Sequence, residues 1–210
     1  RVTAKVPTQH TTKDRSAERT PVFRWRGGTT GAFHSYEDSD RYRVVSLMNS
    51  DSWLRNISDV KFDGGVTSEN VGELHVSDAL MGNSQSLDEM SQTWFHLDLD
   101  GNANSWRGTR WKLASGVPVI KTVSPFVQWY YPLLRDGQHL LLWDLDSNST
   151  TVMMSHNDKH DEGVNQLRSI NKEFLHRTWD EARNDFTDFT EMAKRAGTFA
   201  EEIFHRKAGE

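Results

Sequence analysis

One segment near the middle of the chain constrains the fold more than any other. Residues Trp94–Leu99 alternate between apolar and polar side chains, which is typical of a strand. A polar loop follows, then a helix start after Ser105 with the helix-like stretch Gly108–Leu113, and a short apolar strand, Val117–Ile120. The alternation divides the residues of the first strand between two faces: Phe95, Leu97 and Leu99 on one, and His96, Asp98 and Asp100 on the other. This order of elements predicts a βαβ unit of a parallel sheet.

The rest of the chain also alternates between short apolar strands and amphipathic helices. Strands are expected at Pro21–Arg26, Val60–Phe62 and His139–Trp143. Helices are expected over 37–49, 125–134, 164–174 and 185–205, and a loop or insertion over 66–85. The sequence therefore predicts an α/β fold, a Rossmann-like parallel sheet with flanking helices. We expect a linker or tail over 1–20, one domain over 21–180 and a C-terminal helix over 181–210.

Charge and composition argue against several classes of protein. The net charge of −5 and the isoelectric point near 6.0 argue against a nucleic-acid-binding protein, which would carry a basic face. No apolar run approaches the roughly 18 residues of a membrane span, so none is expected in this chain. Cysteine is absent, which excludes disulfides and thiolate metal sites. Two N-glycosylation sequons, at Asn56 and Asn148, permit a lumenal location.

The polar loop after the central strand carries the strongest chemical signal. Ser105 is a good residue to begin a helix, and Arg107 lies in the first turn, where a cation opposes the helix dipole. A cation is unfavourable there unless an anion binds nearby. The loop also lies at the carboxyl end of a strand, where open α/β sheets bind phosphates. This predicts a nucleotide or sugar-nucleotide site, and the alternative is an arginine paired with Asp98 or Asp100.

A second anion-binding signal directly follows the first expected strand, in the segment Arg26-Gly27-Gly28-Thr29-Thr30. Glycine lets the backbone approach an anion closely, threonine hydroxyls can donate to it, and arginine neutralises its charge. The segment lacks the spacing and the lysine of a P-loop, so that class is excluded. An ordinary turn between a strand and a helix is the alternative.

The segment Asp98–Asn104 imitates two metal-binding motifs. As a calcium loop it has Ala103 in place of the turn glycine and Thr109 in place of the bidentate glutamate, so it fails. As an Asp-x-Asp manganese motif it offers Asp98 and Asp100, but both close a strand that leads into a helix. We expect the two carboxylates to organise the loop, and we expect no metal.

Several segments together suggest a family. In order they are Arg26-Gly-Gly-Thr-Thr30, Phe95-His-Leu-Asp-Leu-Asp-Gly-Asn102 with Ser105-x-Arg107, Leu113-Ala-Ser-Gly116, Trp129-Tyr-Tyr-Pro-Leu-Leu134 and His139-Leu-Leu-Leu142. Over residues 20–180, this series resembles glycosyltransferase family 90, the fungal capsule-associated xylosyltransferases and animal protein O-glucosyltransferases.

The resemblance implies a GT-B architecture, of which this chain would be the C-terminal, donor-binding half. It implies an inverting transfer of xylose or glucose from a UDP-sugar to a glycan or protein hydroxyl, with no cofactor and no required metal. The partners would be the UDP-sugar donor, the glycan or protein acceptor, and an N-terminal acceptor half outside this chain. The location would be the secretory pathway (Golgi or ER lumen), or a membrane reached through an anchor outside this chain.

The resemblance also assigns roles to single residues. Arg26 and Arg107 would act as electrophiles on the leaving group. The residues expected around the nucleotide, its diphosphate and the sugar are Gly27, Gly28, Thr29, Thr30, Gly101, Asn102 and Ser105. Two positions depart from the family's pattern. Gln128 stands where the family tends to have a glutamate in contact with ribose or sugar hydroxyls. The spacing from Arg107 to Lys121 is about one residue longer than in the family, which leaves Arg110 as an alternative to Arg107.

Catalysis also requires a base, and the resemblance places it in the N-terminal half. Nothing that precedes Arg26 resembles such a base. A second hypothesis is therefore a non-catalytic sugar-nucleotide or glycan-binding module derived from the same fold. A third is a structural α/β domain whose arginines form only ion pairs.

Overall fold

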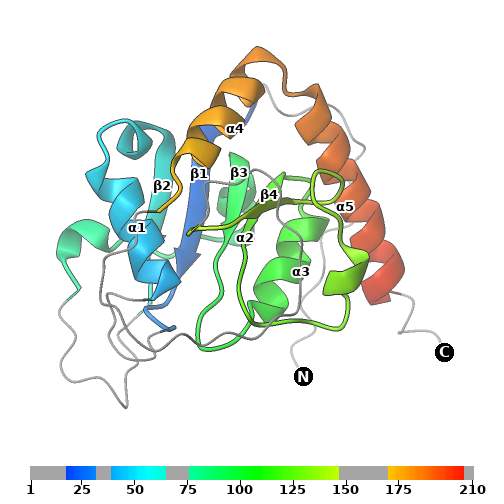
Figure 1. Cartoon of the computed structure of the whole chain (residues 1–210), viewed down its shortest axis with the longest axis horizontal. Helices are drawn as coiled ribbons and strands as arrows, with labels where there is room; N and C mark the ends of the chain where they lie inside the picture. Colours follow the sequence, from blue (N-terminus) through cyan, green and yellow to red (C-terminus); the bar gives the residue numbers. More distant parts are fainter. Residues whose placement is uncertain (1–17, 32–38, 65–75, 147–169, 206–210) are drawn as a thin grey trace.

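Five strands form a single sheet in the computed structural model, which describes residues 18–31, 39–64, 76–146 and 170–205 (Figure 1). Neighbouring strands are parallel, and their order across the sheet is β2-β1-β3-β4-β5. The strands are β1 (Thr20–Gly27), β2 (Ser58–Phe62), β3 (Thr93–Asp98), β4 (Val119–Thr122) and β5 (Leu141–Trp143). The predicted α/β fold with a Rossmann-like parallel sheet is confirmed.

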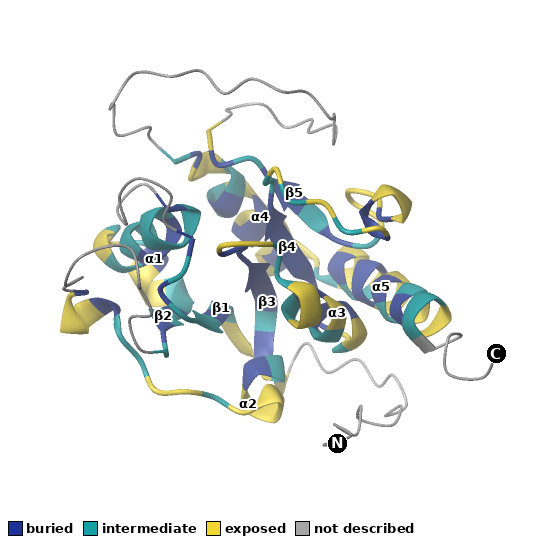
Figure 2. Cartoon of the chain, turned by 90° about the horizontal axis from the view of Figure 1, so that it is seen from below, coloured by how far each residue is buried: buried dark blue, intermediate teal, exposed yellow. Residues whose placement is uncertain are grey.

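Helices cover both faces of this sheet (Figure 2). They are α1 (Asp40–Ser50), α2 (Leu87–Ser91), α3 (Trp106–Ala114), α4 (Glu173–Asn184) and α5 (Thr187–His205). Side chains of α1 and α4 share one core cluster, and α3 packs against α5 at the other face. Because β1 lies between β2 and β3, the direction of winding reverses there. The loops that follow β1 and β3 therefore leave the carboxyl edge of the sheet as neighbours.

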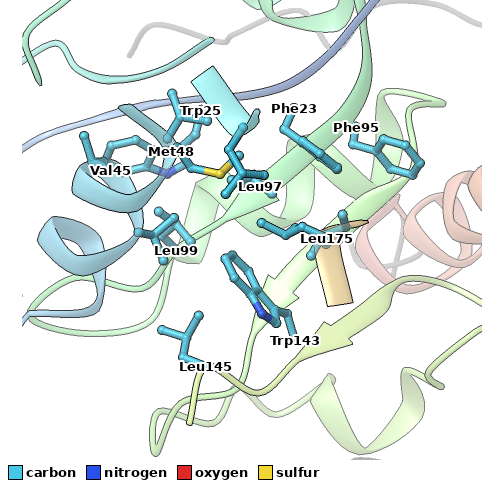
Figure 3. Close-up of a cluster of buried hydrophobic side chains, with 14 of the residues drawn as sticks. Phe23, Trp25, Val45, Met48, Phe95, Leu97, Leu99, Trp143, Leu145 and Leu175 are labelled. Atoms are coloured by element: carbon cyan, nitrogen blue, oxygen red, sulfur yellow. The ribbon is translucent and has the colours of Figure 1, made fainter. Parts of the chain in front are cut away.

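The larger core lies between the sheet and helices α1 and α4 (Figure 3). Phe95, Leu97 and Leu99, at alternate positions in and just after β3, are 0% exposed and belong to this core, which confirms the predicted alternation. The ring of Phe23 in β1 lies 5.3 Å from the ring of Phe95 and 5.3 Å from that of Trp179 in α4, measured between ring centroids. These rings fix the two central strands against α4.

The last helix, α5, contributes to both cores. Phe189 and Met192, near its start, belong to the core that contains α1 and α4. Ala196 and Ala200, two turns later, belong to the smaller core beside α3, where their short side chains allow the two helices to lie close together. The helix predicted over 181–210 thus packs directly on the domain predicted over 21–180.

One predicted helix is wrong. Residues 125–134 contain only a 3₁₀ turn, Tyr131–Leu133, although their apolar residues recur at helical spacing. Val127 and Trp129 are 54% and 59% exposed whereas Tyr130 is buried, so these residues do not share one buried face. The two prolines of the segment also lack the N–H group that an inner helical turn requires.

The two closing helices begin later than their apolar residues suggest. Helix α4 begins after Ile170, and α5 begins one residue after Phe186. Part of the predicted stripe over 164–174 lies outside the described residues, as do 1–17 of the predicted tail and 65–75 around the start of the predicted loop. The described remainder of that loop is irregular apart from a 3₁₀ turn. None of the helices in the described part of the chain is long and apolar enough to span a bilayer.

Candidate functional site

The loops that follow β1 and β3 are joined by a direct hydrogen bond at the carboxyl edge. The backbone N–H of Gly31 donates to Oδ1 of Asn102 across 2.8 Å. Gly31 has a φ of 110°, which favours glycine, and a Cβ there would lie 3.3 Å from the backbone of Gly101. The structure therefore brings the predicted segment Gly27–Thr30 next to the predicted residues of the β3 loop.

A third element, α1, holds these two loops together through Arg41. Its guanidinium donates to the carbonyl of Gly28 (2.9 Å) and the hydroxyl of Thr30 (2.6 Å) in one loop. It also donates to the carbonyls of Leu99 and Asp100, both at 3.1 Å, in the other. Sequence reasoning missed this residue. The signal was available, because Arg41 is, like Arg107, an arginine in the first turn of a helix.

The carboxylate of Asp100 organises the β3 loop and the start of α3. It accepts hydrogen bonds from the backbone N–H of Ser105 (2.8 Å), from Lys121 Nζ (3.0 Å to each oxygen) and from Ser124 Oγ (2.5 Å). Ser105 lies at the helix boundary as predicted, but its side chain makes no capping hydrogen bond to the helix. The N-terminus of α3 therefore begins without a side-chain cap, at the edge where the two loops meet.

The neighbouring carboxylate of Asp98 is completely buried between two lysines. Lys112 Nζ lies 2.6 Å from one of its oxygens, and Lys121 Nζ (3.4 Å) and Thr109 Oγ1 (2.6 Å) contact the other. Burial alone would raise the pKa of Asp98, but the two ammonium groups and the hydrogen bonds lower it below its usual range. Of the two Asp-x-Asp carboxylates, Asp100 organises the loop, as expected for both, whereas Asp98 binds side chains of α3 and β4.

The two arginines of α3 lie in different environments. Arg107 is exposed in the first turn and makes no ion pair with any residue that the structure describes. The alternative in which Arg107 pairs with Asp98 or Asp100 is wrong, because lysines occupy both carboxylates. Arg110, one turn later, stacks on Phe204 of α5 with its Cζ 4.3 Å from the ring centroid. Of the two candidates, Arg107 is the one placed at the N-terminus of the helix.

The structure does not bring Arg26 into this group. Its guanidinium pairs with the Asp59 carboxylate (2.5 Å) and donates to the carbonyls of Asp59 (2.8 Å), Trp25 (3.0 Å) and Asn83 (3.0 Å). These contacts direct it toward β2, away from the β3 loop. Strand alternation is the cause, since Arg26 projects from the face of β1 opposite that of Trp25. The backbone of the following glycines reaches the edge, but the arginine side chain does not.

Two polar side chains at this edge have no hydrogen-bond partner among the described residues. Thr29, in the β1 loop, is only 5% exposed, and its Oγ1 is unpaired. Oδ1 of Asn104, in the β3 loop, is also buried and unpaired. Because unpaired buried polar atoms cost free energy, both are candidate contacts for a bound polar ligand.

Exposed aromatic side chains flank the same edge. Trp106, at the start of α3, is 68% exposed, and Trp129, in the segment after β4, is 59% exposed. Gln128 precedes Trp129 and is half-buried, and its carbonyl accepts the N–H of Tyr131 across 3.0 Å. An exposed indole ring offers an apolar face on which a base or a sugar ring can stack.

No protein family model matches this sequence, and no curated protein matches it at a significant level.

Proposed function

We propose that the chain binds a UDP-sugar at the carboxyl edge of its sheet, between the loops that follow β1 and β3. The observation that carries the proposal is the joint between these loops, in which Gly31 donates to Asn102 and Arg41 binds both sides. This joint lies at the point where the winding of the sheet reverses, which is where open α/β sheets bind nucleotides.

The diphosphate is the part of the ligand that fits the start of α3. The helix begins there without a side-chain cap, and its free N–H groups and dipole favour an anion. Arg107 is the cation within reach of such an anion, and a charge-assisted hydrogen bond contributes on the order of 1.5–3 kcal/mol. The Thr29 hydroxyl would donate to or accept from the hydroxyl groups of the ligand, and Asn104 Oδ1 would accept from them.

The reaction that we propose is an inverting transfer by a family 90-like glycosyltransferase with GT-B architecture. An acceptor hydroxyl attacks the anomeric carbon of xylose or glucose while a carboxylate removes its proton and UDP leaves. Arg107 and the N-terminus of α3 stabilise the negative charge that develops on UDP. No metal or cofactor enters this proposal, and the acceptor is a glycan or protein of the secretory pathway.

We place the catalytic base in the N-terminal acceptor half that the resemblance implies. Asp98 and Asp100, beside the loop joint, are buried and bound to lysines, so neither accepts a proton from an acceptor hydroxyl while these contacts persist. Asp40, which precedes Arg41 in α1, forms an ion pair with Arg43.

A thermal-shift titration with UDP, UDP-xylose, UDP-glucose and GDP tests the proposal. Binding at about 100 times the dissociation constant stabilises the folded state by roughly 2.7 kcal/mol, which is readily visible. Stabilisation by the uridine compounds and not by GDP is expected. Arg107→Ala should weaken it, whereas Arg110→Ala, the matched control, should preserve it because Arg110 stacks on Phe204. The absence of any shift in the wild-type chain, or equal losses in the two variants, would contradict the proposal.

A non-catalytic glycan-binding module is the second candidate function. The exposed rings of Trp106 and Trp129 favour it, because an indole face can stack on the apolar face of a sugar ring. This alternative predicts that Trp106→Ala and Trp129→Ala weaken binding to oligosaccharides that carry no nucleotide. A chain stabilised by UDP but not by any free oligosaccharide would exclude it.

A further inference from the structure

Four charged side chains form a buried cluster between the sheet and α3. They are Asp98, Asp100, Lys112 and Lys121, whose side chains are between 0% and 5% exposed. The parallel pairing of β3 and β4 places Lys121 beside Asp98, so the lysine extends along β3 toward the loop that follows it. Lys112 comes from α3 and contacts Asp98 alone, while Lys121 contacts both carboxylates. The two lysines are therefore equally buried but differently connected.

We infer that Lys121 is a positioning residue for the nucleotide site and acts through Asp100. This inference rests on the proposed function, because the loop that Asp100 organises is the one assigned to the ligand. Lys121 does not touch the ligand. It fixes the Asp100 carboxylate, which in turn holds the N–H of Ser105 and so fixes where α3 begins.

The charges explain why Lys121 is needed for this arrangement. Besides Lys121, the Asp100 carboxylate is bound by two neutral donors, the N–H of Ser105 and the hydroxyl of Ser124. Without the ammonium group, Asp100 would be a buried anion whose carboxylate is bound by no cation among the described residues, which is unfavourable. The carboxylate would turn toward water and release Ser105. The carbonyl of Asp100 would stay fixed, because Arg41 binds it from the side of α1.

Lys112 offers a matched control. It is as buried as Lys121, and its partner Asp98 binds Thr109, within the body of α3. Removal of Lys112 leaves Asp98 with one cation fewer, whereas removal of Lys121 does so for both Asp98 and Asp100. Only Lys121 binds the carboxylate that holds Ser105, so a looser loop before α3 in Lys121→Met and not in Lys112→Met reports positioning.

The experiment compares UDP affinity and unfolding in urea for Lys121→Met and Lys112→Met. Both variants should unfold at lower urea concentration. Lys121→Met should weaken UDP binding by about tenfold or more, while Lys112→Met should change it by much less than tenfold. The double variant Lys121→Met/Asp100→Asn should recover most of the affinity, because the amide oxygen can still accept the Ser105 N–H without an uncompensated charge. Equal losses of affinity in the two single variants would overturn the inference.

Amide hydrogen exchange provides a readout that needs no ligand. The N–H of Ser105 donates to Asp100 Oδ1, and that of Gly101 donates to the carbonyl of Ala103, so both should be protected. Lys121→Met should accelerate exchange at both positions, and Lys112→Met should not. If Lys121→Met does not fold, Ser124→Ala removes a weaker partner of the same carboxylate and should accelerate exchange at Ser105. A chain that binds no UDP would overturn the proposed function, whereas unchanged exchange would overturn the positioning role.

Discussion

The backbone N–H of Gly31 donates a hydrogen bond of 2.8 Å to the side chain of Asn102, 71 residues away in the sequence. The bond joins two glycine-containing loops across the point where the sheet reverses its winding. Their junction, with Arg41 beneath it and the N-terminus of α3 beside it, is the feature on which the functional account depends.

Asn102→Ala removes the acceptor of this bond. We expect it to lower the free energy of unfolding by about 0.5–1.5 kcal/mol, the usual net contribution of one hydrogen bond, and to weaken UDP binding. Asn102→Asp keeps an acceptor for Gly31 but adds a negative charge beside the site of the diphosphate. It should therefore retain more stability than Asn102→Ala while still binding UDP poorly. Urea unfolding and UDP titration of both variants check this, and wild-type behaviour of Asn102→Ala in both would count against the junction.

Gly101→Ala should destabilise the chain through steric conflict. A Cβ at this position would lie 2.5 Å from Thr30 Oγ1 and 2.9 Å from Arg41 Cζ, inside van der Waals contact. Overpacking of this kind costs about 1–3 kcal/mol. Gly28→Ala is the control, since a Cβ there meets nothing within 4 Å. Equal unfolding midpoints for the two variants in urea would show that Gly101 does not lie in close contact with Thr30 and Arg41.

Arg41→Met should separate the two loops while keeping much of the side chain's apolar contact with Trp25. The guanidinium lies 5.4 Å from the centroid of that ring, and it donates to four different oxygens of the two loops. Carbonyls left without a donor cost about 1–3 kcal/mol when they remain buried. We expect lower stability and weaker UDP binding together. Arg43→Met, on the same helix, removes ion pairs with Asp40 and Asp146 and should leave UDP binding intact.

His96 should make stability depend on pH. Its ring is completely buried against Trp111, and neither nitrogen has a hydrogen-bond partner among the described residues. Burial lowers the pKa of His96 well below its usual value, with Lys112 adding to the effect, so the folded chain keeps the ring neutral. In the unfolded chain it binds a proton below about pH 6.5, so stability should fall by up to about 1.4 kcal/mol per pH unit as the pH drops from there.

The variant His96→Leu should remove this part of the pH dependence. Leucine fills a similar volume, cannot be protonated and leaves no buried polar atom unpaired. Urea unfolding of both chains at several values between pH 7.5 and pH 5 provides the comparison, with about 6.5 as the ordinary pKa of histidine. Parallel curves for the wild type and the variant would mean that His96 does not bind a proton on unfolding in this range.

The sequence predicted the central strands well because their pattern has one simple cause. Phe95, Leu97 and Leu99 face the core that contains α1 and α4, whereas His96 and Asp98 are buried on the other face, against Trp111 and Lys112 of α3. The same reasoning failed over 125–134. Aromatic residues there recur at helical spacing, yet each packs separately, and sequence spacing does not distinguish that from a helix.

The residues of the site were predicted in part. The glycine loops and Arg107 follow from their positions after strands, and the structure places both loops at one junction. The pairing of Asp98 and Asp100 with Lys112 and Lys121 depends on the register of β3 with β4 and on the packing of α3, which local sequence does not define. One sign was present, since a lysine inside the apolar strand Val119–Thr122 needs a buried partner.

The position of the Arg26 side chain also depends on strand pairing, which local sequence does not define. Its side chain could project toward the loops or toward β2, and the choice required knowing that β2 places Asp59 beside it. An arginine next to a glycine loop is therefore a weaker indication of an anion site than the loop itself. The preceding strand determines where the backbone of Gly27–Gly31 lies. It does not determine which residue the long side chain of Arg26 binds.

An NMR titration of the ¹⁵N-labelled chain with UDP locates the ligand without relying on a variant. We expect the amide signals of residues 27–31 and 99–108 to shift together as UDP is added, and GDP to produce much smaller shifts. Signals from the end of α4 and the first turns of α5, where Phe186 contacts Trp94 at the start of β3, should stay in place. Shifts confined to other parts of the chain, or none with UDP in large excess, would contradict a nucleotide site between the loops that follow β1 and β3.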